Sequence, residues 1–381
     1  MKGMNDLANT SKDYQRKKLE IWLLSNTLEL LALVFFLITG LSAGLRSSLE
    51  SILNNHFAVF SLYLLIIAAA HFVLFSPFSY LRGYRLEKQY RLTNETFCNW
   101  LKDHSKMATI GWTLGFAAIF CINFLLRHYP ANWWSCAALL LWAGYVLLVQ
   151  WMPIIILPFF FKIKPLENEE LMKQISCLAA KAGIGISGVF EFNMSRKTKA
   201  ANAAVVGLGS TRRILLADTL LSGFTNDEIS AVIAHEMAHQ KQRHMLKIIF
   251  INLIFLLSFF YVSDTILKWG VGAFRFKGLD DVAALPLLAI VFTIGSFILL
   301  PLINSFMRKM ENEADDLSLR WCGNPDAFIS MMQKLSDENL ADPDPPPLLE
   351  TFFYSHPSTG KRIAHAISFK HNNVQTNDSK Y

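Results

Sequence analysis

The chain has 381 residues, of which 52% are hydrophobic and 30 are Phe, and its formal net charge is +6. This composition is too apolar for an ordinary soluble domain, and the chain is too long for a single membrane-free core of this kind. A positive charge would suit a nucleic-acid partner, but the placement of the basic residues along the chain gives it a different explanation.

Six apolar stretches are long enough, or nearly so, to cross a hydrocarbon layer of about 30 Å. They lie at Ile21–Gly44, Phe57–Tyr80, Ala108–Leu126, Trp133–Phe161, Ile248–Trp269 and Ala284–Phe306. The fourth is long and contains Pro153 and Pro158, so it is expected to be tilted or kinked. The sequence therefore predicts an α-helical polytopic membrane protein with about six spans, or seven if the fourth stretch holds two.

Basic residues alternate in number between the polar segments that separate these stretches. The N-terminal tail has five and the second loop has six, whereas the first and third loops have one each. In chain order they are Lys2, Lys12, Arg16, Lys17 and Lys18, then Arg46, then Arg82, Arg85, Lys88, Arg91, Lys102 and Lys106, then Arg127. Positive charge gathers on the cytoplasmic side of a membrane, so the N-terminus is predicted to be cytoplasmic, and no nucleic-acid partner is expected.

The spans divide the chain into four parts. An N-terminal membrane domain with four spans covers residues 1–161, and a polar segment at 162–247 follows on the cytoplasmic side. A membrane hairpin of two spans covers 248–306, after which residues 307–381 return to the cytoplasm. The two polar parts are predicted to form a small cytoplasmic α+β domain.

The polar parts have mixed patterning. Asn168–Ala182 is typical of an amphipathic helix, and Gly207–Ser210 is typical of a hairpin turn. Arg308–Trp321 is helical in pattern and closed by Gly323, whereas Asp337–Pro347 is predicted to be a loop. Three runs with apolar or β-branched filling predict strands, at Gly188–Phe192, Ala203–Val206 and Arg213–Ala217.

A further helix leads into the most specific motif of the chain. Thr225 and Glu228 have the spacing of a capping box, which predicts that a helix begins there. That helix runs into His235-Glu236-Met237-Ala238-His239. Residues four apart lie on one helical face, so both imidazoles can bind one metal ion, and Glu236 can take a proton from a water on it. The motif predicts a zinc hydrolase.

Two His supply only part of a catalytic zinc site, which needs a third protein ligand and an open position. The metzincin pattern would place Gly at position 242 and His at position 245, but the chain has Gln242 and Met245. His244 would lie half a turn away from His235 on a continuous helix, so it is expected to face elsewhere. The third ligand must therefore come from another segment.

The candidates lie beyond the last span, in Glu311-Asn312-Glu313-Ala314-Asp315. Glu311 and Asp315 are four apart on one helical face, so one can bind the metal while the other accepts the free N–H of a ligand His. This helix must start on the side of the membrane where the His pair ends. Glu313 competes with Glu311, and the spacing leaves both open as the third ligand.

The chain resembles the membrane-bound zinc metallopeptidases of the CAAX prenyl protease type 1 family from about Gly83 onward. The resemblance rests on an ordered set of elements: Leu86–Tyr90, Thr93–Phe97, Trp100–Asp103, Pro165–Glu167, Asn202–Ala203, Arg213–Leu221, His235–His239, Glu311 to Asp315, and His356–Pro357 with Arg362. Apart from the zinc motif, each element alone is weak evidence for the family, but all of them in this order are strong evidence. The family pattern Glu-x-x-Ala-Asp falls on Glu311 to Asp315, so the resemblance favours Glu311 as the third ligand.

The resemblance implies an intramembrane-chamber protease, whose helices enclose a hollow with the zinc at its cytoplasmic end. It implies that Asn202 and Ala203 lie on an edge strand that pairs with an extended substrate backbone. It also implies that His356 and Arg362 point at the oxyanion of the tetrahedral intermediate, where fixed donors lower the barrier.

The resulting hypothesis is an integral-membrane zinc metalloendopeptidase with one Zn²⁺ per chain. His235, His239 and Glu311 hold the metal, and Asp315 bonds to a ligand His. Glu236 is expected to act as the base and then to deliver the proton to the leaving amine. The expected partners are membrane lipid and a peptide or protein substrate, lipidated or bare, and the sequence does not indicate the oligomeric state.

Some features depart from the eukaryotic members of this family. Those members usually count seven spans, and the segment Asp316–Ser318 differs from the aromatic-rich pattern of the prenyl-specific enzymes. The C-terminus also lacks an ER retrieval signal. The expected location is therefore a prokaryotic inner membrane, or the ER membrane if the source is eukaryotic, with the active site on the cytoplasmic side.

Two other functions remain open from the sequence. The chain could be a general quality-control protease that clips damaged membrane proteins. It could also be a membrane channel or transporter in which the His pair forms a structural metal site. A transporter would need neither Glu236 nor an open metal position, so that residue separates the two classes.

Overall fold

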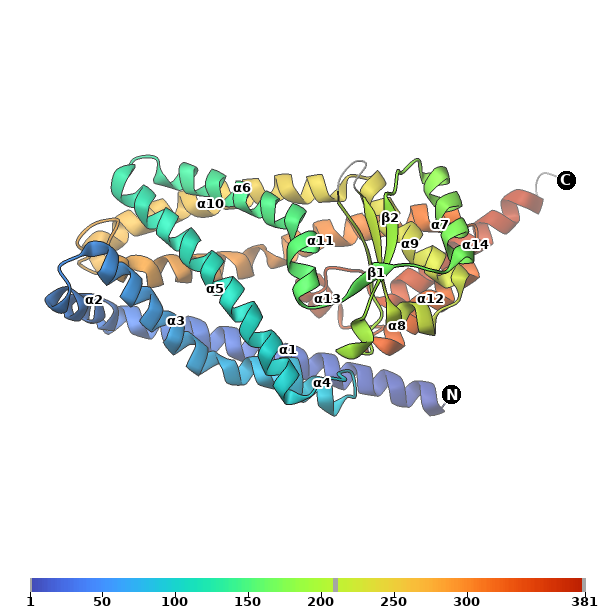
Figure 1. Ribbon diagram of the computed structural model, residues 1–381, viewed down its shortest axis with the longest axis horizontal. Helices are drawn as coiled ribbons and strands as arrows, with labels where there is room; N and C mark the ends of the chain where they lie inside the picture. Colours follow the sequence, from blue (N-terminus) through green and yellow to red (C-terminus); the bar gives the residue numbers. More distant parts are fainter. Residues whose placement is uncertain (1, 208–211, 379–381) are drawn as a thin grey trace.

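The computed structural model describes residues 2–207 and 212–378. Six helices in these ranges are long and apolar enough to cross a membrane, which confirms the six predicted spans. They run along the length of the molecule, and the sheet lies toward the end at which the C-terminus lies (Figure 1). The spanning helices are α1 (Lys2–Ile38), α3 (His56–Tyr80), α5 (Phe97–His128), α6 (Trp133–Trp151), α10 (His244–Ala273) and α11 (Leu285–Cys322).

Several helices extend beyond the apolar stretches that predicted them. α1 includes the polar head of the chain and ends before Gly40, whose φ of 74° is a left-handed conformation that glycine adopts without strain. The short helix α2 (Leu41–Ile52) follows it. At the other end of α3, a π-helical turn, η1 (Leu81–Arg85), and α4 (Leu86–Gln89) continue the helical path.

The last span is longer than expected. α11 runs without a break from Leu285 to Cys322, so the predicted helix Arg308–Trp321 is not a separate element. It ends at Gly323, with φ 62°, as the sequence indicates. The candidate metal-binding residues on this segment therefore lie on a rigid extension of a membrane helix.

The fourth apolar stretch holds one span. α6 ends at Trp151, and a π turn, η2 (Met152–Ile156), and a 3₁₀ turn, η3 (Leu157–Phe159), follow it. Each turn has a proline among its first two residues, and a proline cannot donate a backbone N–H to continue an α-helix. The prolines therefore end the span, and no seventh span lies within this stretch.

The spans pack together at their two ends. Far from the sheet, Trp133 and Phe260 belong to one buried cluster, and a buried ion pair between Arg46 and Asp281 joins α2 to the loop before α11. Between the ends, the described residues include no buried side chain in 15–36, 64–85, 97–122, 139–150, 245–259 or 292–303. The buried side chains of the bundle therefore lie toward its two ends.

The polar domain contains a four-stranded mixed sheet. Its strands are β1 (Ile163–Pro165), β2 (Gly188–Phe192), β3 (Ala203–Val206) and β4 (Arg213–Ala217), in the order β1-β2-β4-β3. β2 and β4 are parallel, and the two outer pairs are antiparallel. The three predicted strands are confirmed, β3 is an edge strand, and β1 is too short to have a sequence signal. The predicted Gly207–Ser210 turn falls mostly outside the described residues.

Six shorter helices surround the sheet: α7 (Glu169–Ala182), α8 (Asp218–Gly223), α9 (Asn226–Lys241), α12 (Pro325–Glu338), α13 (Pro347–Phe353) and α14 (Thr359–Asp378). Single 3₁₀ turns lie at η4 (Met194–Arg196) and η6 (Val282–Ala284). The predicted loop Asp337–Pro347 is shorter in the structure, because α12 continues to Glu338 and α13 already begins at Pro347. α9 packs against α7, α11, α12 and β3, which fixes its place at the centre of the domain.

The predicted capping box at the start of α9 is present. The Thr225 hydroxyl accepts from the Glu228 N–H, and Glu228 Oε2 accepts from the Thr225 N–H at 2.8 Å. Glu228 is also bonded to Lys334 at 2.7 Å and to Ser330 at 2.5 Å. Burial would raise the pKa of the Glu228 carboxyl, but these three partners outweigh burial and hold it below its usual value.

Replacing Glu228 by Gln is expected to destabilise the polar domain by about 1–2 kcal/mol at neutral pH, because the charged hydrogen bonds are lost. The lowered pKa means that the carboxylate stabilises the fold above its unfolded-state pKa, and that this contribution fades as the pH falls through the folded-state pKa. Thermal unfolding in detergent should therefore separate the two proteins at pH 7 and bring them together in acid. The exposed Glu170→Gln variant serves as a control and should unfold like the wild type.

Candidate active site

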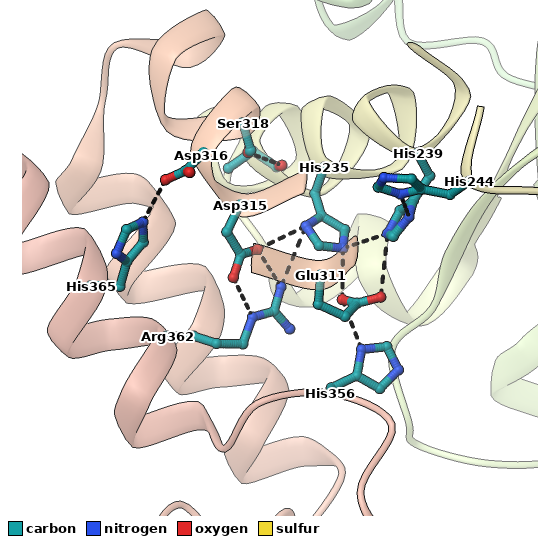
Figure 2. Close-up of polar contacts among 11 residues, drawn as sticks. His235, His239, His244, Glu311, Asp315, Asp316, Ser318, His356, Arg362 and His365 are labelled. Atoms are coloured by element: carbon teal, nitrogen blue, oxygen red, sulfur yellow. Dashed lines mark hydrogen bonds and ion pairs between the residues drawn. The ribbon is translucent and has the colours of Figure 1, made fainter. Parts of the chain in front are cut away.

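The His pair lies on the buried side of α9, as its spacing predicts. His235 and His239 are one helical turn apart, and their Nε2 atoms are 3.1 Å apart. Ile229, Ala231 and Ile233 anchor the preceding turns in the core, so the helix cannot rotate to release the pair. Figure 2 shows both rings turned toward the carboxylate of Glu311.

Glu311 comes from α11 and completes the cluster. Its Oε2 lies 3.2 Å from His235 Nε2, and its Oε1 lies 3.4 Å from His239 Nε2. Three ligands about 2.0–2.1 Å from a tetrahedral ion should be roughly 3.3 Å from one another. The three separations match that spacing, so these residues can hold one metal ion between them.

The burial, hydrogen bonds and pKa values of these three residues show whether the cluster suits a cation. Glu311 is 2% exposed, and its Oε2 has no well-aligned hydrogen bond within the described residues although two ring nitrogens approach it. Burial would lower the pKa of His235, but hydrogen bonds with Asp315 and Glu311 outweigh burial and raise it to about 9. Burial and the neighbouring His235 lower the pKa of His239 to about 4. The neutral ring of His239 and the buried carboxylate of Glu311 both offer lone pairs to a cation, so the cluster fits a metal ion.

Asp315 bonds to His235 on the side away from the cluster. Its Oδ1 accepts from His235 Nδ1 at 2.8 Å, as the Glu-x-x-x-Asp spacing predicts. Arg362, from α14, makes a two-pronged contact with the same carboxylate, with Nε to Oδ2 at 2.7 Å and Nη2 to Oδ1 at 2.6 Å. The fork fixes Asp315, which in turn fixes the ring of His235 with Nε2 pointing at the metal position.

The structure corrects the prediction for His244. α9 ends at Lys241, and Arg243 adopts a left-handed conformation, with φ 55°, before α10 begins at His244. This break turns the chain back, so His244 lies against His239 with their Nδ1 atoms 2.8 Å apart. His244 lies outside the metal cluster, as predicted, but the assumption of one continuous helix was wrong. Glu313 contacts His244 and lies outside the cluster, so Glu311 is the carboxylate that is grouped with the two His.

Glu236 is placed to act on a substrate. Its side chain is half-buried and lines the same cavity as His235 and Glu311. Within the residues that the structure describes, no hydrogen bond or ion pair ties up its carboxylate. Burial raises the pKa of Glu236 above its usual value, and the nearby Glu311 adds to the shift, whereas His235 opposes it. A carboxylate made more basic in this way is suited to general base catalysis.

The cavity has a volume of about 990 Å³ and brings the other predicted residues together. Asn202 and Ala203 line it at the edge strand, and His356 and Arg362 line it near the cluster. His356 is exposed, with its Nδ1 2.8 Å from Glu311 Oε2. All nine predicted site residues therefore lie at one cavity or directly behind it.

One wall of the cavity was not foreseen. Lys12, Gln15 and Lys18 line it from α1, and Gln15 donates a hydrogen bond to the Leu340 carbonyl at 2.7 Å. The sequence pattern indicates only a polar head before the first span in this tail. The tail and the first span form one continuous helix, and recognising that helix in the sequence could have indicated that the tail extends beyond the membrane toward the site.

Two family models match the chain. Residues 165–369 match Peptidase family M48, and residues 4–162 match the CAAX prenyl protease N-terminal region, described as five membrane helices. In the described part of 4–162, four helices are long and apolar enough to span, and α2, with 12 residues, is too short. The fold and the metal cluster agree with both matches.

Similar proteins support the same family. The uncharacterized metalloprotease YhfN of Bacillus subtilis (strain 168) is 30% identical over 93% of this chain and 84% of its own length. CAAX prenyl protease 1 of Saccharomyces cerevisiae is 26% identical over 75% of this chain and 67% of its own. The crystal structure of S. mikatae Ste24p has a TM-score of 0.84 at 22% identity, covering 95% of this chain and 89% of that one, which shows a shared fold. The chain therefore belongs to peptidase family M48, as a metalloprotease with several membrane spans.

Proposed function

We propose that this protein is a zinc endopeptidase that cleaves membrane-associated peptide or protein substrates, CAAX-type prenylated peptides among them. The observation that carries the proposal is the spacing of His235 Nε2, His239 Nε2 and the Glu311 carboxylate, with Glu236 beside them at one cavity. Zinc suits this donor set, because two imidazoles and one carboxylate leave a fourth position open.

The residues around the cluster each have a task in peptide hydrolysis. A zinc ion held there would polarise the attacking water and the substrate carbonyl. Glu236 takes the proton from the attacking water and then delivers it to the leaving amine. His356 and the Nη1 end of Arg362 supply donors to the developing oxyanion, since Nε and Nη2 of Arg362 are already bonded to Asp315.

The edge strand β3 offers a place for the substrate backbone. The Asn202 carbonyl accepts from the Ala217 N–H at 3.0 Å, so Asn202 faces β4. Backbone groups alternate in direction along a strand, so the N–H and C=O of Ala203 face the opposite way, toward the open edge. An extended peptide can pair with this edge and bring its scissile bond past Glu236.

The arrangement of the membrane helices favours a substrate that reaches the site from the bilayer. The described residues in the middle of the spanning helices include few buried side chains, and Lys18 and Trp22 of the first span line the cavity at the cluster. The alternation of basic residues favours a cytoplasmic N-terminus and active site. The departures of the sequence from the eukaryotic members favour a prokaryotic inner membrane. A transporter is disfavoured, because transport needs neither the base Glu236 nor three ligands with a fourth position open.

The substrate class is tested by the cleavage rates of one matched peptide pair, farnesylated and bare, with purified protein in detergent. A strong preference for the farnesylated peptide would support CAAX-type cleavage. Equal rates would support general proteolysis of membrane proteins, the second candidate. No cleavage of either peptide above a Glu236→Gln blank would contradict the proposal for both classes.

Removing the metal is expected to abolish cleavage reversibly. A chelator should strip the cluster, and added Zn²⁺ should restore the rate at about one ion per chain, as metal analysis of the recovered protein can check. The Glu311→Ala variant lacks one of three ligands and should not recover under the same conditions. If the chelated wild type keeps its full rate, the metal is not part of the reaction.

A further inference from the structure

His244 is a buried histidine with both ring nitrogens in use. It is 1% exposed and stands at the first position of α10. Its Nδ1 lies 2.8 Å from His239 Nδ1, and its Nε2 lies 3.1 Å from Glu313 Oε2 on α11. Figure 2 shows the His244 ring beside the ring of His239, on the side away from Glu311. Neither His244 nor Glu313 touches the metal position.

The order of donors and acceptors along this chain of contacts is fixed once His239 binds a metal. His239 Nε2 faces His235 and Glu311, so it is the nitrogen that offers its lone pair to the ion. The proton of the neutral ring then sits on Nδ1, which donates to Nδ1 of His244. The proton of His244 is thereby placed on Nε2, from which it is donated to the Glu313 carboxylate. A single tautomer of each ring satisfies every contact.

We propose that His244 and Glu313 form a positioning pair, which orients His239 and strengthens its bond to the metal. The pair acts through His239 and touches neither the substrate nor the reacting atoms. A hydrogen bond to the outer nitrogen of a ligand His fixes its tautomer and raises its basicity, and partners of this kind contribute about 10–100-fold in metal affinity. This inference rests on the proposed zinc site.

The two ligand histidines are supported differently. His235 donates directly to the carboxylate of Asp315, which is 1% exposed and paired with Arg362. His239 instead reaches a carboxylate through a neutral ring, and Glu313 is also 3.3 Å from Lys247. The positive charge of the exposed Lys247 partly compensates the negative charge of Glu313. His239 is therefore stabilised more by the hydrogen bond through His244 than by the negative charge of Glu313. Removing His244 should therefore cost more affinity than neutralising Glu313.

The pair also joins the metal site to the membrane hairpin. His239 lies in the last turn of α9, His244 begins α10, and Glu313 lies on α11 two residues beyond Glu311. The two contacts of His244, to His239 on α9 and to Glu313 on α11, thus hold the helices that carry the proposed ligands in place relative to each other. A buried histidine that only filled space at the junction of α9 and α10 would not need this double contact.

The test measures zinc affinity in the purified full-length protein in detergent, by competition with a chelating indicator. His244→Leu removes the acceptor for His239, whereas His244→Asn keeps an oxygen close to the place of Nδ1 but cannot reach Glu313. Glu313→Gln keeps the shape of the last partner and removes its charge. His365→Asn is the matched control, because His365 pairs with Asp316 at 2.7 Å between α14 and α11 on the protein surface.

The expected order of zinc affinity is wild type, then Glu313→Gln and His244→Asn, then His244→Leu, the last about 10–100-fold weaker than the wild type. Adding Glu313→Gln to His244→Leu should cause no further loss, because the relay is already broken. The His365→Asn control should bind like the wild type. Unfolding of the zinc-free proteins, followed in parallel, separates a folding defect from a loss of positioning.

Two results would overturn the inference. One is zinc affinity of His244→Leu within about twofold of the wild type while Glu311→Ala no longer binds. The other is a uniform loss in all His244 variants, the Asn form included, that follows their lower unfolding midpoint in the zinc-free state. Because zinc binding is measured without a substrate, failure of the proposed protease function would appear separately, as a wild type that binds zinc and cleaves no peptide.

Discussion

Replacing Glu236 by Gln is expected to lower kcat by about 10²–10⁴-fold, to the limit of detection, while zinc content stays at the wild-type level. The amide keeps the size of the side chain and cannot accept the proton of the attacking water. Glu236 is not one of the three donor residues of the cluster, so the metal keeps its ligands. Peptide cleavage and metal analysis on the same protein preparation measure both quantities.

The two measurements together decide the role of Glu236. The surface variant Glu170→Gln is a suitable control for the purification and should cleave at the wild-type rate. Loss of zinc from Glu236→Gln would show that Glu236 helps to hold the metal. Cleavage at an undiminished rate would contradict its assignment as the base and would require another group at this cavity.

The pH profile should report the environment of the same residue. Burial raises the pKa of Glu236, so the free enzyme should lose activity on the acid side at a higher pH than an exposed glutamate would dictate. The acid limb of kcat/KM is the quantity to follow, with zinc content checked at each pH to exclude metal loss.

The sequence predicts the parts of this protein that depend on local patterns. Thr225 and Glu228 define the start of α9, and the spacing of His235 and His239 defines their common face, so both features could be predicted from a few neighbouring residues. The three short strands β2, β3 and β4 are also found with their predicted bounds. The spans follow from apolar length alone, and their number is confirmed.

The relation between distant segments could not be predicted in the same way. Glu311 and Glu313 have the same chemistry and differ only in the face of α11 that they occupy, and that choice depends on how α11 packs against α9. The contact of His244 with His239 could not be predicted, because no residue in Lys241–Arg243 signals a helix break. Arg243 adopts a left-handed φ of 55° there, which an arginine in a run of polar residues does not signal.

Arg362 makes a contact that the sequence did not indicate. The resemblance implies a role toward the oxyanion, and the structure adds a two-pronged bond to Asp315, with the Nη2 atom 3.4 Å from His235 Nδ1. One residue therefore lies between the metal ligands and the substrate cavity. A role in positioning and a role in catalysis predict different kinetics, so a variant can separate them.

Replacing Arg362 by Gln is expected to lower kcat by about 10²–10³-fold with little change in KM, as for the loss of one oxyanion donor. Zinc should be retained, because Asp315 keeps its 2.8 Å contact with His235 when the arginine is gone. The matched variant Asp315→Asn should show the opposite pattern, with zinc affinity about 10–100-fold weaker, since His235 then loses its carboxylate. Steady-state kinetics and zinc competition on the two variants give the comparison.

The result of this comparison decides the role of the Nη1 atom of Arg362. A fall in kcat at full zinc occupancy means that Nη1 contacts the developing charge, and Arg362→Lys should then recover only part of the rate, because lysine keeps the charge and loses the fork. A loss of zinc in proportion to activity in Arg362→Gln would instead mean that the arginine acts only by holding Asp315. In that case the oxyanion would depend on His356 alone, and His356→Phe should abolish cleavage without releasing the metal.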